Sequence, residues 1–120
     1  MTYAEIKKYL SMMTEPADKL EAVMEIGAAS PAVPAGAVCH EIAGCASRVE
    51  ICRMDNNFYV SADSAIVRGV AAILCAMVDG LDAEQIREMD MCSEFRGLNL
   101  ALGAGRLNGV NSMISFFKNL

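Results

Sequence analysis

Apolar residues recur at helical spacing towards both ends of the chain and alternate with polar residues in the middle. Thr2 begins a Thr-x-x-Glu capping box, which satisfies free backbone donors at a helix start and predicts a helix to about Met13. A second helix is expected with Pro16 in its first turn and Gly27 as its stop. Together these segments predict a helical hairpin over residues 2–27.

The central segment changes from loop to strand character. Residues 28–46 contain Pro31, Pro34 and Gly36, which rule out a regular helix and predict a surface loop leading to Cys45. The alternation in Ser47–Met54 and the aromatic run in Asn57–Ala62 then predict two antiparallel strands. With Asp-Asn turn chemistry between them, these strands form a hairpin over residues 47–62.

The C-terminal part, residues 64–120, is expected to be helical. Ala65–Val78 is apolar on nearly all sides, which is typical of a buried helix, and Asp63 with its neighbour Ser64 is expected to cap it. Further helices are expected at residues 82–89, within 91–105 and at 106–118. The whole pattern predicts one α+β domain, residues 1–120, with helices on one face of a small antiparallel sheet of about three strands.

Charge and hydropathy narrow the possible environments. The net charge is −5, and no window gathers the Lys and Arg residues that nucleic-acid binding requires. The longest apolar run, Val70–Val78, is far shorter than the ~18 residues of a membrane-spanning helix. The N-terminus carries charges where a signal peptide needs an apolar core, so we expect a cytoplasmic protein that binds neither nucleic acid nor membranes.

Five cysteines are the main candidates for chemistry. Their odd number and the absence of a CxxC motif favour free thiols in a reducing compartment over a disulfide framework. Cys45 stands out because it lies between the loop and the first strand, after Gly44 and before small residues. Cys75 falls within the buried helix, and an inert structural role for Cys45 stays open on these grounds.

Metal binding is the alternative chemistry. Cys39, His40, Cys45 and Cys52 fall within 14 residues, and thiolates with imidazole suit zinc or an iron–sulfur cluster. Their spacing matches no standard ligand motif, so we expect no resident metal. A lone histidine is more often a local hydrogen-bonding group than a ligand or base.

Four segments, in this order, resemble the signature of the SufE-type cysteine desulfuration proteins. They are Gly44-Cys45-Ala46-Ser47-Arg48-Val49, Ala62-Asp63-Ser64-Ala65-Ile66-Val67-Arg68-Gly69, Gly80 to Ile86 with Asp90, and Arg106-Leu107-Asn108-Gly109. The resemblance spans residue 16 to the C-terminus. The chain departs from the family pattern at Glu50, commonly tryptophan, at His40, commonly asparagine, and at Gly105, commonly serine.

The resemblance implies a fold and a reaction. The fold is an α+β sandwich shared with iron–sulfur scaffold proteins. The reaction is sulfur transfer, in which the Cys45 thiolate takes the outer sulfur of a persulfide held by a PLP-dependent cysteine desulfurase. The chain then needs no cofactor of its own, because the PLP belongs to the partner.

The same resemblance suggests supporting residues around the thiol. Gly44 and Ser47 belong to the loop, in which Ser47 is expected to form a hydrogen bond, and Arg106 is a candidate cation for the thiolate. His40 departs from the family pattern, but it lies within five residues of Cys45 and is therefore a candidate partner that raises the thiolate fraction. Asp63 is expected to cap the buried helix rather than to take part in transfer.

Partners and alternatives follow from this interpretation. The chain is expected to act with a cysteine desulfurase, stimulating it, and to pass sulfur to an iron–sulfur scaffold; a homodimer is possible. The alternatives are a metal or cluster scaffold that uses Cys39, Cys45 and Cys52, and a non-catalytic interaction module.

Overall fold

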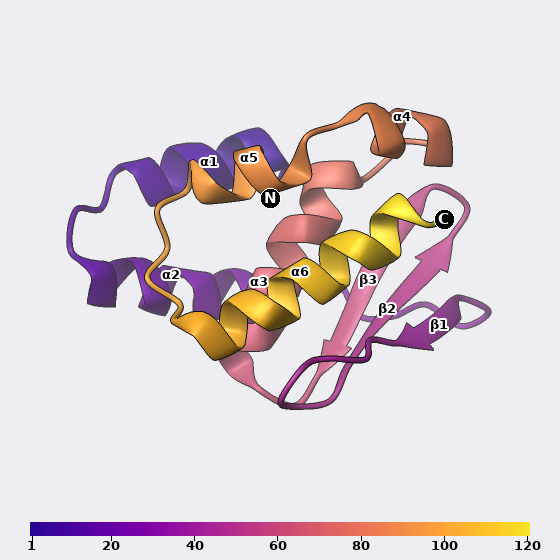
Figure 1. Ribbon diagram of the computed structural model, residues 1–120, viewed down its shortest axis with the longest axis horizontal. Helices are drawn as coiled ribbons and strands as arrows, with labels where there is room; N and C mark the ends of the chain where they lie inside the picture. Colours follow the sequence, from indigo (N-terminus) through magenta and orange to yellow (C-terminus); the bar gives the residue numbers. More distant parts are fainter.

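The computed structural model describes residues 1–120 and contains six helices and one three-stranded sheet (Figure 1). The elements in chain order are α1 (Tyr3–Ser11), α2 (Pro16–Ala29), β1 (Val38–Glu41), β2 (Val49–Met54), β3 (Asn57–Ala62), α3 (Ala65–Val78), α4 (Ala83–Glu88), α5 (Met91–Arg96) and α6 (Ala104–Lys118). The predicted α+β class is confirmed.

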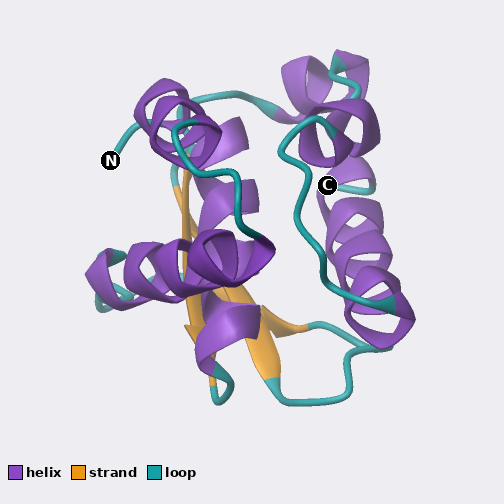
Figure 2. Ribbon diagram, turned by 90° about the vertical axis from the view of Figure 1, so that its left-hand side faces the viewer, coloured by secondary structure: helices purple, strands orange, loops and turns teal.

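The sheet is fully antiparallel, with strand order β1-β2-β3. Val49 and Ile51 of β2 are buried and lie opposite Ala62 and Val60 of β3, so this face of the sheet closes the core. Figure 2 shows α3 between α2 and α6, the arrangement that completes the helical layer. None of the six helices combines the length and the hydropathy that a membrane span requires.

The β2–β3 hairpin forms where the alternating pattern predicts it. Asp55 in the turn has a φ of 55°, a left-handed conformation that a short polar residue tolerates. Arg53 Nε donates to the Asp55 carbonyl at 2.9 Å and its guanidinium reaches Asn56. The turn residues therefore fix the register that places alternate strand residues in the core.

Helix α2 does not stop at Gly27, as the sequence suggested, but continues to Ala29. Gly27 lies inside the helix because α2 crosses α3 at very close range: a Cβ built on Gly27 would lie 2.6 Å from the Gly69 nitrogen. A Cβ on Gly69 would lie 2.0 Å from the Val23 carbonyl oxygen. The glycines serve helix packing here, not helix termination.

The predicted loop over residues 28–46 is also partly wrong. Its first two residues complete α2, and Val38–Glu41 form the edge strand β1. The sequence signal was weak because all four residues of β1 are exposed, so they show no alternation of burial. Residues 30–37 pass behind the sheet in Figure 1 before β1 begins.

The helix starts follow the predicted chemistry with two corrections. The capping boxes at Thr2 and Asp82 are both formed. Ser64, not Asp63, caps α3, by accepting from the Val67 amide at 3.3 Å. Helix α6 begins at Ala104, slightly before the predicted Arg106.

Candidate functional site

The candidate site is built on the loop of residues 42–48, which joins β1 to β2 and lies against α6. Gly44 has a φ of +87°, a conformation that L residues with a side chain rarely adopt. A Cβ at Gly44 would lie 2.5 Å from Ser112 Oγ on α6, so the loop can approach the helix only because position 44 has no side chain. This approach turns the next residue, Cys45, towards α6.

The Cys45 thiol faces the backbone of α6. Its Sγ lies 3.8 Å from the carbonyl oxygen of Gly109, to which the thiol donates. A Cβ at Gly109 would lie 3.3 Å from Sγ, so this glycine also makes room for the sulfur. A cavity of about 50 Å³ adjoins the thiol, and apolar residues from α3 and α6 contribute to its wall.

Burial raises the pKa of the Cys45 thiol above its usual value, because the apolar wall disfavours the thiolate. The donated S–H bond to Gly109 also requires the protonated form. We expected a nearby cation to increase the thiolate fraction; in this conformation burial acts against the thiolate, and the effect of Arg106 on the thiol stays a prediction. The protonated, neutral thiol is therefore the favoured form in this conformation.

The two candidate activating residues occupy different places. Arg106 lines the small cavity beside Cys45, on the first turn of α6, as expected for a loop that folds back. His40 instead packs on Phe116, with ring centroids 5.6 Å apart, and lines a groove between β1 and α6. The structure therefore brings Arg106 to the thiol and not His40.

Ser47 and Asp63 also differ from expectation. The Ser47 hydroxyl is buried without a hydrogen-bond partner, so it does not brace the loop as suggested. Asp63 is exposed and lies 3.7 Å from Arg48, whose guanidinium also pairs with Glu50. Arg48 thus links the end of the loop of residues 42–48 to β2 and to the residue that follows β3.

Sequence reasoning missed the partners of the loop on α6, namely Gly109 and Ser112. A signal existed for the first of them, because a glycine inside an amphipathic helix often marks a close approach of another segment. Nothing in the pattern singled out Ser112, which meets Gly44 only through the tertiary fold.

Cys39 and Cys52 are joined by a disulfide, which contradicts the expectation of free thiols. The two residues lie directly opposite each other in the antiparallel β1–β2 register, with Cα atoms 3.9 Å apart. The linear spacing of cysteines does not carry this register, which explains the error. Cys45, Cys75 and Cys92 are free.

The disulfide also bears on the metal-scaffold alternative. Two of its three proposed cysteine ligands are bonded to each other. No group of three or more His, Cys, Asp or Glu side chains gathers in a geometry that could hold a metal ion. The structure therefore does not bring Cys39, Cys45, Cys52 and His40 together as a ligand set.

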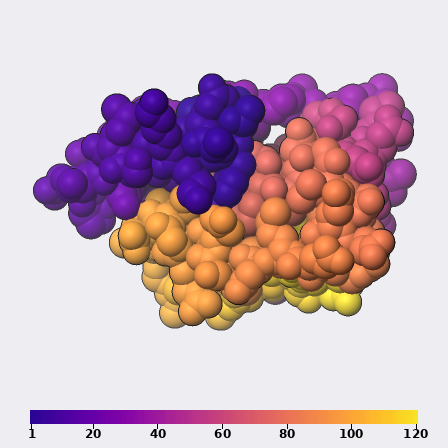
Figure 3. Space-filling view, turned by 90° about the horizontal axis from the view of Figure 1, so that it is seen from above, coloured from indigo at the N-terminus to yellow at the C-terminus, as the bar shows by residue number.

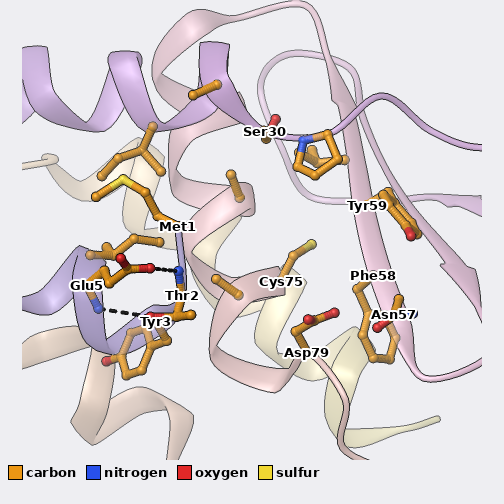
Figure 4. Close-up of a pocket in the computed structure, with 17 residues that line it drawn as sticks. Met1, Thr2, Tyr3, Glu5, Ser30, Asn57, Phe58, Tyr59, Cys75 and Asp79 are labelled. Atoms are coloured by element: carbon orange, nitrogen blue, oxygen red, sulfur yellow. Dashed lines mark hydrogen bonds between the residues drawn. The ribbon is translucent and has the colours of Figure 1, made fainter.

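A second, larger cavity lies away from the loop, between α1, the end of α2, β3 and α3 (Figure 4). Its volume is about 670 Å³, and Figure 3 shows the surface hollowed between the N-terminal residues in indigo and the strand segment near residue 60. Cys75 and Asp79 line it. Burial first, and then the Asp79 charge, raise the pKa of Cys75 to about 12, so this thiol stays protonated.

Comparisons with known proteins support the fold and the resemblance to the SufE family. The family model described as "SufE: Fe-S metabolism associated domain" matches residues 4–120. The sulfur acceptor protein CsdE of Escherichia coli (strain K12) is 29% identical over 94% of this chain and 83% of its own. An uncharacterized SufE-like protein of Rhizobium meliloti (strain 1021) is 31% identical over 85% of this chain and 81% of its own.

A solved structure has the same fold at low sequence identity. It is the solution structure of a hypothetical protein from Thermus thermophilus, with a TM-score of 0.72 and 14% identity, covering 99% of this chain and 94% of that one. The α+β fold of this chain is therefore shared with a protein of low sequence identity. The chain belongs to the SufE family, which is associated with iron–sulfur metabolism.

Proposed function

We propose that this protein is a sulfur acceptor that takes persulfide sulfur from a PLP-dependent cysteine desulfurase onto Cys45. The observation that carries the proposal is the position of the Cys45 thiol, on a surface loop and beside a cavity of about 50 Å³. That volume exceeds the roughly 10–15 Å³ that a cavity needs to hold one water molecule, so one added sulfur atom fits beside Sγ.

The reaction begins when the loop carries Cys45 away from Gly109 and into contact with the partner. Outside the apolar wall, the cause of the raised pKa is removed and the thiolate forms by loss of a proton to solvent. The thiolate attacks the outer sulfur of the desulfurase persulfide, and the old S–S bond breaks. The desulfurase cysteine leaves as a thiolate, and Cys45 carries the persulfide.

The return of the loop protects the product. A persulfide folded back against α6 is shielded from external reductants by the wall that Val67, Val70 and Met113 help to form. By removing the product persulfide, the protein stimulates the desulfurase, and it then delivers the sulfur to an iron–sulfur scaffold. The group carried is covalent, and PLP resides in the partner.

Arg106 has the best position to assist transfer. It borders the cavity at the start of α6, where the exposed backbone amides and its guanidinium both favour a negative sulfur. Ser47 offers a hydroxyl without a partner on the same loop. A thiolate or persulfide anion that passes this region is stabilised by donors from both sides.

The proposal is tested by mass spectrometry after incubation with a cysteine desulfurase and L-cysteine. We expect the wild-type protein to gain one sulfur atom on the peptide that contains Cys45, and Cys45→Ser to gain none. Cys92→Ser is the matched control, because it removes an exposed free thiol elsewhere and should load normally. Loading on Cys92 instead of Cys45 contradicts the proposal.

One observation favours a second function, a non-catalytic interaction module. The Cys45 thiol is neutral and partly buried, as an inert cysteine would be. The two functions differ in the reactivity of Cys45 towards a small alkylating reagent compared with buried Cys75. An inert Cys45 reacts as slowly as Cys75, whereas a carrier whose loop opens reacts much faster.

A further inference from the structure

The Cys39–Cys52 disulfide closes a covalent ring that contains the loop of residues 42–48. The two cysteines are separated by 13 positions in sequence, and Cys45 lies near the middle of the ring. The loop with the reactive thiol is therefore tethered at both ends by one bond. A change in that bond acts directly on the segment that presents Cys45.

Apart from this bond, the strand at the start of the ring is weakly held. Strand β1 lies at the edge of the sheet and pairs only with β2. All four of its residues are exposed, and its contact with the helical layer is made by His40, which packs on Phe116. The first buried residue after it is Ile42, whose amide donates to the Val49 carbonyl at 2.9 Å. Short edge elements with little buried surface are the segments that open first.

The disulfide and the Cys45 thiol are separate sites on opposite faces of the sheet. His40 contacts Phe116 of α6, and neighbouring residues on a strand point to opposite faces. The side chains of Cys39 and its partner Cys52 thus point away from α6, while Cys45 faces that helix. The pair does not act as a resolving partner for Cys45 in this conformation.

We propose that the Cys39–Cys52 disulfide is a regulatory redox site whose substrate is a dithiol reductant. Its redox state controls how often the loop that carries Cys45 opens. In the oxidised state the disulfide bond holds β1 against β2 and keeps Cys45 against α6. In the reduced state β1 separates from β2 more often, and the loop carries Cys45 outward more often.

The exchange reaction begins at the exposed residue of the pair. Cys39 is exposed, whereas Cys52 is only 1% exposed, so a reductant thiolate attacks Cys39 Sγ. Cys52 leaves as a thiolate and takes up a proton. The second thiol of the reductant, as thiolate, then attacks the mixed disulfide and releases the Cys39 thiolate, which is also protonated. The products are two cysteine thiols and an oxidised dithiol, so two electrons and two protons have moved.

The test measures how fast iodoacetamide labels Cys45, quantified on its peptide by mass spectrometry. One sample is oxidised with glutathione disulfide and a second is reduced with dithiothreitol, and both are desalted before labelling. We expect the oxidised sample to carry the Cys39–Cys52 bond and to label at Cys45 at least about threefold more slowly, because local opening governs access to the thiol. This readout needs no desulfurase, so it stands or falls separately from sulfur transfer.

Variants identify the bond responsible. Cys39→Ser changes an exposed side chain and should label at the fast rate after either treatment, and Cys39→Ser with Cys52→Ala should behave in the same way. Cys92→Ser should keep the wild-type difference. The proposal is overturned if Cys39 and Cys52 remain thiols after oxidation, if the bond forms without slowing Cys45, or if Cys39→Ser retains the redox difference.

Discussion

Two places in this molecule bring segments together by means of glycine, and they differ in what the glycine meets. At the crossing of α2 and α3, Gly27 and Gly69 face backbone atoms in the core. Where the loop of residues 42–48 meets α6, Gly44 and Gly109 face the ends of side chains, Ser112 Oγ and Cys45 Sγ. Backbone atoms of two packed helices cannot yield, whereas a hydroxyl or thiol can rotate away.

The two places therefore affect different properties: the helix crossing affects the stability of the fold, and the loop affects the access of reagents to Cys45. A methyl group at the helix crossing must push apart two core elements, so the free energy of unfolding should fall. A methyl group at the loop can be accommodated by moving the loop, so the exposure of Cys45 should change while the core remains intact. The same substitution, Gly→Ala, tests both places.

The largest effect is expected for Gly69→Ala. Its Cβ would lie 2.0 Å from the Val23 carbonyl oxygen, and we expect a loss of about 3 kcal/mol or more in the free energy of unfolding. Urea denaturation measures it. Gly105→Ala is the matched control, since that Cβ meets nothing within 4 Å and the protein should be as stable as wild type or more so. Equal stability of the two variants contradicts the tight crossing.

A smaller loss is expected for Gly44→Ala, about 1–2 kcal/mol, because alanine is strained at a φ of +87°. The contact with Ser112 Oγ should also displace the loop and speed alkylation of Cys45. Gly80→Ala separates the two causes, since Gly80 has a φ of +80° but nothing within 4 Å. It should lose similar stability and leave Cys45 labelling unchanged. Equal labelling rates in the two variants rule out the role of Ser112.

Gly109→Ala should alter access more than stability. The added Cβ would lie 3.3 Å from Cys45 Sγ, tight enough to move the sulfur, while alanine favours the helix by about 1 kcal/mol over glycine. We expect the free energy of unfolding to change by less than about 1 kcal/mol and the labelling of Cys45 to rise severalfold. Unchanged labelling would show that the thiol does not rest against Gly109.

The contrast between the two regions also explains what the sequence could predict. The β2–β3 hairpin follows from alternation and from a local turn, and the buried helix α3 follows from its apolar pattern. Cys45 is a candidate on local features, Gly44 and the loop before it, and the resemblance to the SufE-type proteins favours it over the other thiols. These features depend on neighbours in sequence, which the chain displays directly.

The errors depend on contacts between distant positions. The Cys39–Cys52 bond follows from the β1–β2 register, and the raised pKa of Cys45 follows from a wall on α3 and α6. A glycine such as Gly27 can end a helix or allow two helices to pack closely, and the sequence alone does not distinguish these two roles. Edge strand β1 buries no side chain, so its pattern carried no signal.

The smallest effect is expected for His40→Ala on the ionisation of Cys45. Burial is what raises the pKa of the thiol, and His40 packs on Phe116 instead of pairing with the sulfur. The rate of alkylation against pH should therefore have a midpoint above the ordinary cysteine value of about 8.5, with the same midpoint in both proteins. If an imidazolium did stabilise the thiolate, removing it would raise the midpoint. A rise in His40→Ala alone, with Ser112→Ala unchanged, would thus restore histidine as the activating residue.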